Sequence, residues 1–260
     1  MSRIEAVFER PGHTALIAYV TVGYPSIEAT LKVVPLLAEN GCDIIELGIP
    51  FSDPLAEGVT IQKSSFEALH NGISPQICVE VARKLRQTVE VPLAFMTYFN
   101  LIFNYGLERF SRNCRESGID GLIIPDLPPE EGTELETLAR EKGIDLIYLL
   151  APTSTEERLR LGAERSRGFT YLVSVTGITG ARETLPSDLE AFVARVRKVS
   201  TGPLCVGFGI ANPQQAARVG RIADGVIVGS RIIQLMEAND SMAEVAEFVA
   251  ELRRALDGGD

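Results

Sequence analysis

Histidine and tryptophan are the scarcest residues of this chain, with two and none among 260. The two histidines, His13 and His70, are far apart in the sequence, so no His-rich metal centre is expected. The same scarcity disfavours a Ser–His–Asp triad. We therefore expect that no metal is bound and that any acid–base chemistry uses carboxylates.

Cysteine pairs, long apolar runs and excess positive charge are also missing. The four cysteines form no CxxC pair, which is typical of reduced, buried thiols in a cytoplasmic protein. No apolar run reaches the roughly 18–20 residues that span a bilayer, and the charged N-terminus does not resemble a signal peptide. A net charge of −10 argues against a nucleic-acid partner. We expect neither nucleic acid nor membrane as a partner.

A repeated pattern of short apolar run, Gly- or Pro-containing loop and amphipathic helix extends along the chain. Most runs are apolar at consecutive positions, which suits strands covered on both faces. Eight of them are strand candidates, at residues 15–22, 42–49, 91–99, 121–125, 145–150, 169–174, 203–208 and 225–228. The pattern predicts one α/β domain over residues 1–260, a (β/α)8 TIM barrel with an extra N-terminal helix. An open doubly wound sheet is disfavoured because no GxGxxG follows the first run.

A carboxylate inside the second apolar run is the first candidate for chemistry. Glu46 lies within Ile44-Ile45-Glu46-Leu47, near the end of a strand where barrel active sites form. An acid–base residue with a raised pKa would be placed here, although a structural partner could also neutralise a buried glutamate. The following loop holds Asp53 and Glu57, either of which could be a second carboxylate or simply be solvated.

Glycine-rich segments near the end of the chain indicate a phosphate site. GFGI at residues 207–210 and Gly229-Ser230-Arg231 follow the last two strand candidates, where barrels commonly bind phosphate. A third such loop, TGITG at residues 176–180, is a candidate lid. All five lysines fall outside the strands, which disfavours a Schiff-base aldolase. A flat apolar ligand is suggested by aromatic residues near strand ends: Tyr19, Phe51, Tyr98, Tyr171 and Phe208.

The segment ELGIPFSDPLA at residues 46–56 strongly resembles the signature of the tryptophan synthase alpha subunit family. Further similar segments follow in the family's order: YVTVGYP (19–25), Asn100 with FNYG (103–106), PDLPPE (125–130), YLVS (171–174), GITGA (177–181), GFGI (207–210) and VGS (228–230). Together they cover nearly the whole chain. The resemblance implies retro-aldol cleavage of indole-3-glycerol phosphate to indole and glyceraldehyde 3-phosphate, in the last steps of tryptophan biosynthesis.

The resemblance also implies roles for individual residues. Glu46 matches the general acid–base residue and Glu57 the second catalytic carboxylate, which would hydrogen-bond the indole N–H. The remaining matches are Tyr19, Tyr171 and Phe208 in the indole pocket, Gly180, Gly209, Gly229 and Ser230 around the phosphate, Thr179 in the lid, and Asp53 and Pro54 facing a partner. That partner would be the beta subunit, in an αββα complex. No cofactor is expected in this chain, since the pyridoxal phosphate belongs to the beta subunit.

One departure from the family pattern lies beside the second carboxylate. Glu57-Gly58-Val59 stands where Asp-Gly-Pro is usual, which lengthens the acid by one methylene. Val175-Thr176 also precedes Gly177, where the resemblance leads us to expect a different lid sequence. Two alternatives to the lyase therefore stay open: a weakened barrel that only binds and activates a beta subunit, and another phosphate-binding barrel enzyme such as a sugar-phosphate isomerase.

Overall fold

Nine parallel strands form the barrel, in a computed structural model that describes residues 1–54, 57–173, 188–207, 209–238 and 242–258. They are β1 (Ala15–Thr21), β2 (Ile44–Gly48), β3 (Leu93–Met96), β4 (Gly121–Ile123), β5 (Asp145–Ile147), β6 (Leu149–Leu150), β7 (Thr170–Val173), β8 (Leu204–Gly207) and β9 (Gly225–Val228). Their order is β5-β4-β3-β2-β1-β9-β8-β7-β6. Only Tyr148 separates β5 from β6, and its carbonyl accepts a hydrogen bond from the Tyr171 N–H (3.0 Å). The two short strands therefore act as one, which confirms the predicted eight-stranded barrel.

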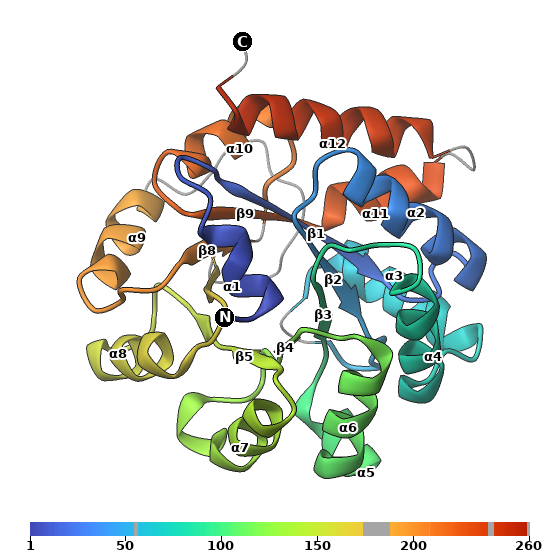
Figure 1. Ribbon diagram of the computed structural model, residues 1–260. Helices are drawn as coiled ribbons and strands as arrows, with labels where there is room; N and C mark the ends of the chain where they lie inside the picture. Colours follow the sequence, from blue (N-terminus) through green and yellow to red (C-terminus); the bar gives the residue numbers. More distant parts are fainter. Residues whose placement is uncertain (55–56, 174–187, 208, 239–241, 259–260) are drawn as a thin grey trace.

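Helices surround the strands, as Figure 1 shows. They are α1 (Arg3–Phe8), α2 (Ile27–Glu39), α3 (Val59–His70), α4 (Pro75–Leu85), α5 (Phe99–Tyr105), α6 (Leu107–Ser117), η1 (Pro129–Glu131), α7 (Thr133–Glu141), α8 (Glu156–Arg165), α9 (Leu189–Arg197), α10 (Pro213–Gly220), α11 (Ser230–Ala238) and α12 (Ala243–Leu256). Ser74 and Asn212 cap the first turns of α4 and α10, as their Ser-Pro and Asn-Pro pairs predict. Among the described residues, none of the helices combines the length and apolar character required to cross a membrane.

Helix α1 closes the amino end of the barrel, where it lies in front of the strands in Figure 1. Ile4 is fully buried, and a Cβ added at Gly121, the first residue of β4, would come within 2.7 Å of its Cδ1 atom. The Ser2 hydroxyl donates a hydrogen bond to Asp145 at the start of β5 (2.5 Å). The predicted N-terminal helix is thus confirmed, and it covers the amino end of the strands.

Three aspartates at the amino end of the barrel have the same structural role. Each directly precedes a strand, and its side chain accepts a hydrogen bond from a backbone N–H at the start of the neighbouring strand. The three pairs are Asp43 with Leu16 (2.9 Å), Asp120 with Leu93 (3.0 Å) and Asp224 with Leu204 (2.7 Å). Asp43 also lies 2.9 Å from the His13 ring. These charged groups, and one of the two histidines, therefore hold strands together rather than perform chemistry.

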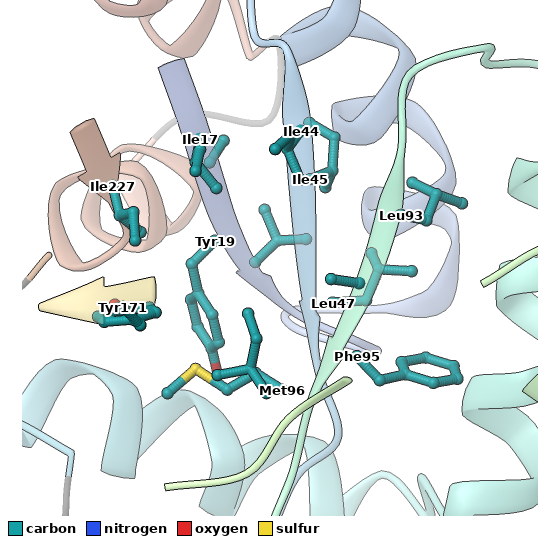
Figure 2. Close-up of a cluster of buried hydrophobic side chains, with 14 of the residues drawn as sticks. Ile17, Tyr19, Ile44, Ile45, Leu47, Leu93, Phe95, Met96, Tyr171 and Ile227 are labelled. Carbon is teal, nitrogen blue, oxygen red and sulfur yellow. The ribbon is translucent and has the colours of Figure 1, made fainter. Parts of the chain in front are cut away.

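Side chains alternate between the barrel interior and the surrounding helices. On β3, Phe95 packs outward against Phe110 of α6 (ring centroids 6.2 Å apart), whereas Met96 turns inward. Figure 2 shows Tyr19, Met96, Tyr171 and Ile227 gathered on the inner side of the strands. The upper layer of the interior thus contains two tyrosine rings and forms the floor of a cavity.

Candidate active site

A small cavity opens at the carboxyl ends of the strands, the end at which barrel enzymes carry their active sites. Its lining brings together seven of the residues expected from the sequence: Tyr19, Glu46, Glu57, Tyr171, Gly209, Gly229 and Ser230. Thr179, Gly180 and Phe208 lie outside the described residues. Sequence reasoning missed Ile61, Met96, Ile210 and Ile227 as lining residues. Their apolar character made them indistinguishable from core residues.

Glu46 enters the cavity from strand β2 and is completely buried. Its register neighbours are Tyr19 on β1 and Ala94 on β3. Within the described part of the chain, neither of its carboxyl oxygens has a hydrogen-bond partner. Burial, and then the nearby Glu57, raise the pKa of Glu46 to about 8. The structural partner that could have neutralised this residue is absent from the described residues, which favours the functional interpretation.

Glu57 reaches the same cavity from the segment just before helix α3 and is only 4% exposed. Its N–H donates to the Pro54 carbonyl (2.9 Å), and its own carbonyl accepts from the Gln62 side chain (2.9 Å). These bonds fix the backbone, so the carboxyl is directed inward. Burial raises the pKa of Glu57 to about 7. The alternative of a solvated loop acid applies to Asp53, which is exposed.

Together the two glutamates form a pair that holds a proton near neutral pH. Each carboxyl is desolvated, and the charge of Glu57 raises the pKa of Glu46 further. Two such buried carboxyls resist ionising together, because the charge of one raises the pKa of the other. One carboxyl can therefore donate a proton while the other stays anionic, and no metal is required. The part of the chain that the structure describes contains no cluster of metal-binding side chains.

The rings of Tyr19 and Tyr171 form a flat apolar surface at the floor of the cavity. Each lies over a glycine of the next strand: a Cβ at Gly48 would come within 2.1 Å of the Tyr19 hydroxyl, and one at Gly207 within 2.3 Å of the Tyr171 hydroxyl. Burial raises the pKa of both phenols, so they remain neutral. Phe51 and Tyr98 stack on each other nearby (4.8 Å between centroids) but do not line the cavity.

Gly209, Gly229 and Ser230 also line the cavity. Gly209 adopts a positive φ of 91°, which only glycine tolerates well. Gly229 and Ser230 follow, and Ser230 is the first residue of α11. The amino end of a helix presents N–H groups and partial positive charge. This part of the cavity is therefore suited to an anion such as phosphate.

A larger groove, with about 2130 Å³ of open space, lies at the amino end of the barrel beside α1. It is lined by residues of the structural amino end, including His13 and Asp224, both engaged in the contacts that hold strands there. The two buried carboxyls, Glu46 and Glu57, lie in the smaller cavity. We therefore assign the candidate active site to the carboxyl end.

A (β/α)8 barrel with a buried acid pair, in a cavity suited to an anion, is typical of the barrel enzymes that act on phosphorylated substrates by proton transfer. The family model for the tryptophan synthase alpha chain matches residues 6–257. The tryptophan synthase alpha chain of Dehalococcoides mccartyi is 56% identical to this chain, over 99% of this chain and 100% of the relative. That of Geobacter sulfurreducens is 47% identical, over 98% of this chain and 99% of the relative. The chain belongs to the tryptophan synthase alpha chain family.

Solved structures agree with this assignment. A chain of tryptophan synthase from Mycobacterium tuberculosis superposes with a TM-score of 0.92 at 36% identity, covering 98% of both chains. Tryptophan synthase subunit alpha from Legionella pneumophila gives 0.91 at 35% identity over 99% of both chains. At these identities, both the barrel and its family are shared.

Proposed function

We propose that this chain is a carbon–carbon lyase that cleaves indole-3-glycerol phosphate to indole and glyceraldehyde 3-phosphate, with Glu46 and Glu57 as its acid–base pair. The observation that carries the assignment is that both carboxyls are buried in one cavity, where Glu46 has no hydrogen-bond partner among the described residues. Membership of the family indicates which substrate is cleaved, and the cavity contains the two carboxyls that the proposed proton transfer requires.

Glu46 is suited to move the proton that the reaction requires. With a pKa of about 8 it carries a proton near neutral pH and can donate it to carbon 3 of the indole ring. The resulting carboxylate then takes the proton of the glycerol hydroxyl beside the breaking bond. That hydroxyl becomes the aldehyde, and the electrons of the broken carbon–carbon bond return to the ring. Glu46 ends the cycle protonated, so the protons balance.

Glu57 is suited to stabilise the cation formed on the way. Protonation at carbon 3 places positive charge on the ring nitrogen, and a nearby carboxylate lowers the energy of that state. Tyr19 and Tyr171 would contact the faces or edges of the indole, and Phe208 would complete this pocket. The phosphate would lie at Gly209, Gly229 and Ser230 with Gly180, and Thr179 would close the lid.

The buried position of Glu57 favours the lyase over a barrel that only activates a partner. The replacement of the family's usual Asp by Glu was the feature that kept this alternative open. The longer side chain still reaches the cavity of Glu46. The acid pair that the lyase reaction requires is therefore complete in this cavity.

We further propose that the chain works with a tryptophan synthase beta subunit in an αββα complex. The pyridoxal phosphate would be held by that subunit, and this chain would need no cofactor. Asp53 is exposed and accepts a hydrogen bond from Ser52 (2.6 Å), so it is available to a partner, whereas Pro54 is buried. We therefore place the contact on Asp53, with Pro54 shaping the loop.

The deciding experiment measures indole release from indole-3-glycerol phosphate by the purified chain, with and without a beta subunit. Indole formation that is stimulated by the beta subunit is the expected result. Stimulation of the beta subunit without any indole formation would instead establish the activating barrel. Titration calorimetry with Asp53→Ala tests the contact, and unchanged affinity would exclude Asp53 from it.

A further inference from the structure

Three buried hydroxyl groups connect the cavity to helix α3. The Tyr19 hydroxyl oxygen lies 3.3 Å from Thr21 Oγ1, which lies 2.7 Å from Ser64 Oγ. The Ser64 hydroxyl in turn donates to the Ile61 carbonyl oxygen (2.9 Å). Thr21 and Ser64 are 0% exposed, so bulk water does not compete for these bonds.

The direction of each hydrogen bond in this row of hydroxyls follows from counting hydrogens, because each hydroxyl has only one to donate. The Ile61 carbonyl can only accept, so the Ser64 hydrogen is used there. Ser64 must then accept from Thr21, which uses the Thr21 hydrogen. The contact between Tyr19 and Thr21 therefore requires Tyr19 as the donor. The phenol hydrogen is committed to Thr21, and the oxygen keeps a lone pair free to accept.

This direction matters because the phenol is the neighbour of both carboxyls. Tyr19 and Glu46 are register partners, and both line the cavity with Glu57. Both Glu46 oxygens and Glu57 Oε2 have no hydrogen-bond partner among the described residues, as expected if the phenol hydrogen points elsewhere. A hydrogen bond donated to a carboxylate would favour its charged form.

We propose that Thr21 and Ser64 are positioning residues that commit the Tyr19 hydrogen away from Glu46 and Glu57, so that neither carboxyl accepts it. The proposal rests on the proposed function, in which a protonated Glu46 must donate to carbon. It adds two residues that never touch the substrate, and it gives the tyrosine hydroxyl a role as an acceptor.

The other groups around the pair do not supply a competing charge. Burial is the main cause that raises the pKa of the neutral neighbours Tyr19, Tyr171 and Cys205, and nearby carboxylates raise it further. For Glu46, burial and Glu57 are the causes of the shift, and no cation contributes within the described residues. The titratable groups that face one another across these elements are Tyr19 (β1), Glu46 (β2), Tyr98 (after β3), Glu57 (before α3), Tyr171 (β7) and Cys205 (β8).

Thr21→Val tests the proposal, because it removes the acceptor while keeping the shape of the side chain. The Tyr19 hydrogen then turns to a carboxylate, and we expect the titration midpoint of the pair to fall by about one unit. The alkaline limb of the kcat profile, where Glu46 loses the proton that it must donate, should move to lower pH by the same amount. Adding Tyr19→Phe removes the donor, so the double variant should return to the wild-type midpoint.

The midpoint is read by ¹³C NMR titration of the glutamate side-chain carboxyls, assigned with Glu46→Gln and Glu57→Gln. This measurement needs no turnover, so it separates a failure of the proposal from a failure of the proposed function. Ser65→Ala is the matched control, since Ser65 is also buried on α3 but lies outside the hydroxyl chain. Thr21→Ser keeps the hydroxyl and should behave as wild type.

Ser64→Ala gives a second route to the same shift if Thr21→Val does not fold. Without Ser64, the Thr21 hydrogen can turn to the Tyr19 oxygen and release the phenol hydrogen to the cavity. An unchanged midpoint in the folded Thr21→Val or Ser64→Ala variant would overturn the proposal. A lowered midpoint that persists in Thr21→Val with Tyr19→Phe would also overturn it, because the phenol would then not be the donor.

Discussion

The phenol ring of Tyr19 lies directly over the α-carbon of Gly48, with the hydroxyl 2.1 Å from the place a Cβ would occupy. Gly48 is the last residue of β2, two positions after Glu46. Tyr171 and Gly207 repeat this arrangement on β7 and β8. A glycine on the following strand is what allows each tyrosine to lie flat at the floor of the cavity.

Gly48→Ala is therefore expected to push Tyr19 into the substrate cavity. Overpacking at a buried site costs about 1–3 kcal/mol, and a displacement near 1 Å close to the reacting groups can reduce the rate about 100-fold. We expect kcat/KM for indole release to fall at least about 10-fold while the barrel still folds. Gly202→Ala, where nothing lies within 4 Å of the added carbon, is the control. Equal activity of both variants would contradict the packing described for Tyr19.

Glu46→Gln should abolish indole release without loss of the fold. Glutamine keeps the shape but cannot transfer a proton, a step that contributes about 10²- to 10⁴-fold. Because burial holds Glu46 protonated near neutral pH, a neutral glutamine of the same shape should leave the barrel intact in circular dichroism and thermal unfolding. Wild-type kcat in a folded Glu46→Gln protein would show that another group carries the proton.

The pH dependence of stability should separate Glu46→Gln from the wild type. The pKa of Glu46 in the folded chain, about 8, lies above the ordinary value of 4.5. The folded state thus binds this proton more tightly, so its contribution is complete below pH 4.5 and is lost as the pH rises towards 8. Each unit of pKa difference corresponds to about 1.4 kcal/mol.

Urea unfolding at pH 5, 6.5 and 8 measures this effect. To isolate the effect of Glu46, both proteins in the comparison also carry Glu57→Gln. The free energy of unfolding of the protein that keeps Glu46 should fall over this pH range, and that of the protein with Glu46→Gln should not. Parallel pH profiles of these two proteins would mean that Glu46 is not held protonated.

Ser230→Asp tests the anion site by charge alone. Ser230 begins α11 and lines the cavity, so a carboxylate there repels a phosphate while it suits the helix terminus. We expect KM for indole-3-glycerol phosphate to rise at least about 10-fold with an unchanged melting temperature. Ser230→Asn is the uncharged control. Gly229 is less suitable, because a Cβ there would lie 3.1 Å from Tyr19. An equal KM for both variants would move the phosphate elsewhere.

Glu57 and Val59 can be exchanged for the family's usual residues as a pair. Val59 is the first residue of α3 and is 64% exposed, a position where proline is well tolerated. Val59→Pro should therefore leave stability unchanged or raise it by about 0.5 kcal/mol. Glu57→Ala should lose most activity, Glu57→Asp alone should not exceed the wild type, and Glu57→Asp with Val59→Pro should recover.

Kinetic assays of the four proteins with indole-3-glycerol phosphate make this comparison, with thermal unfolding beside them. Wild-type kcat/KM in Glu57→Ala would show that the second charge comes from elsewhere. The recovery in the double variant tests whether the two departures from the family pattern compensate each other.

The sequence by itself determined the barrel and most of its cavity. Parallel strands covered on both faces must be apolar at consecutive positions, so the runs were visible, and a carboxylate such as Glu46 within one of them stood out because burial is costly. Gly209, Gly229 and Ser230 were also identified, since loops after the last strands of a barrel follow a common pattern.

Only the tertiary structure decided which of the two loop acids is buried. Asp53 and Glu57 have equally polar side chains, so the sequence does not show that Asp53 is exposed and Glu57 is buried. The division of one strand at Tyr148 and the lining by Met96 and Ile227 likewise depend on register between segments far apart. Thr21 and Ser64 are 43 positions apart, and no local pattern predicts that their hydroxyls meet. Such contacts form only when the strand and the helix are packed together, since local preferences set each element but long-range packing sets its neighbours.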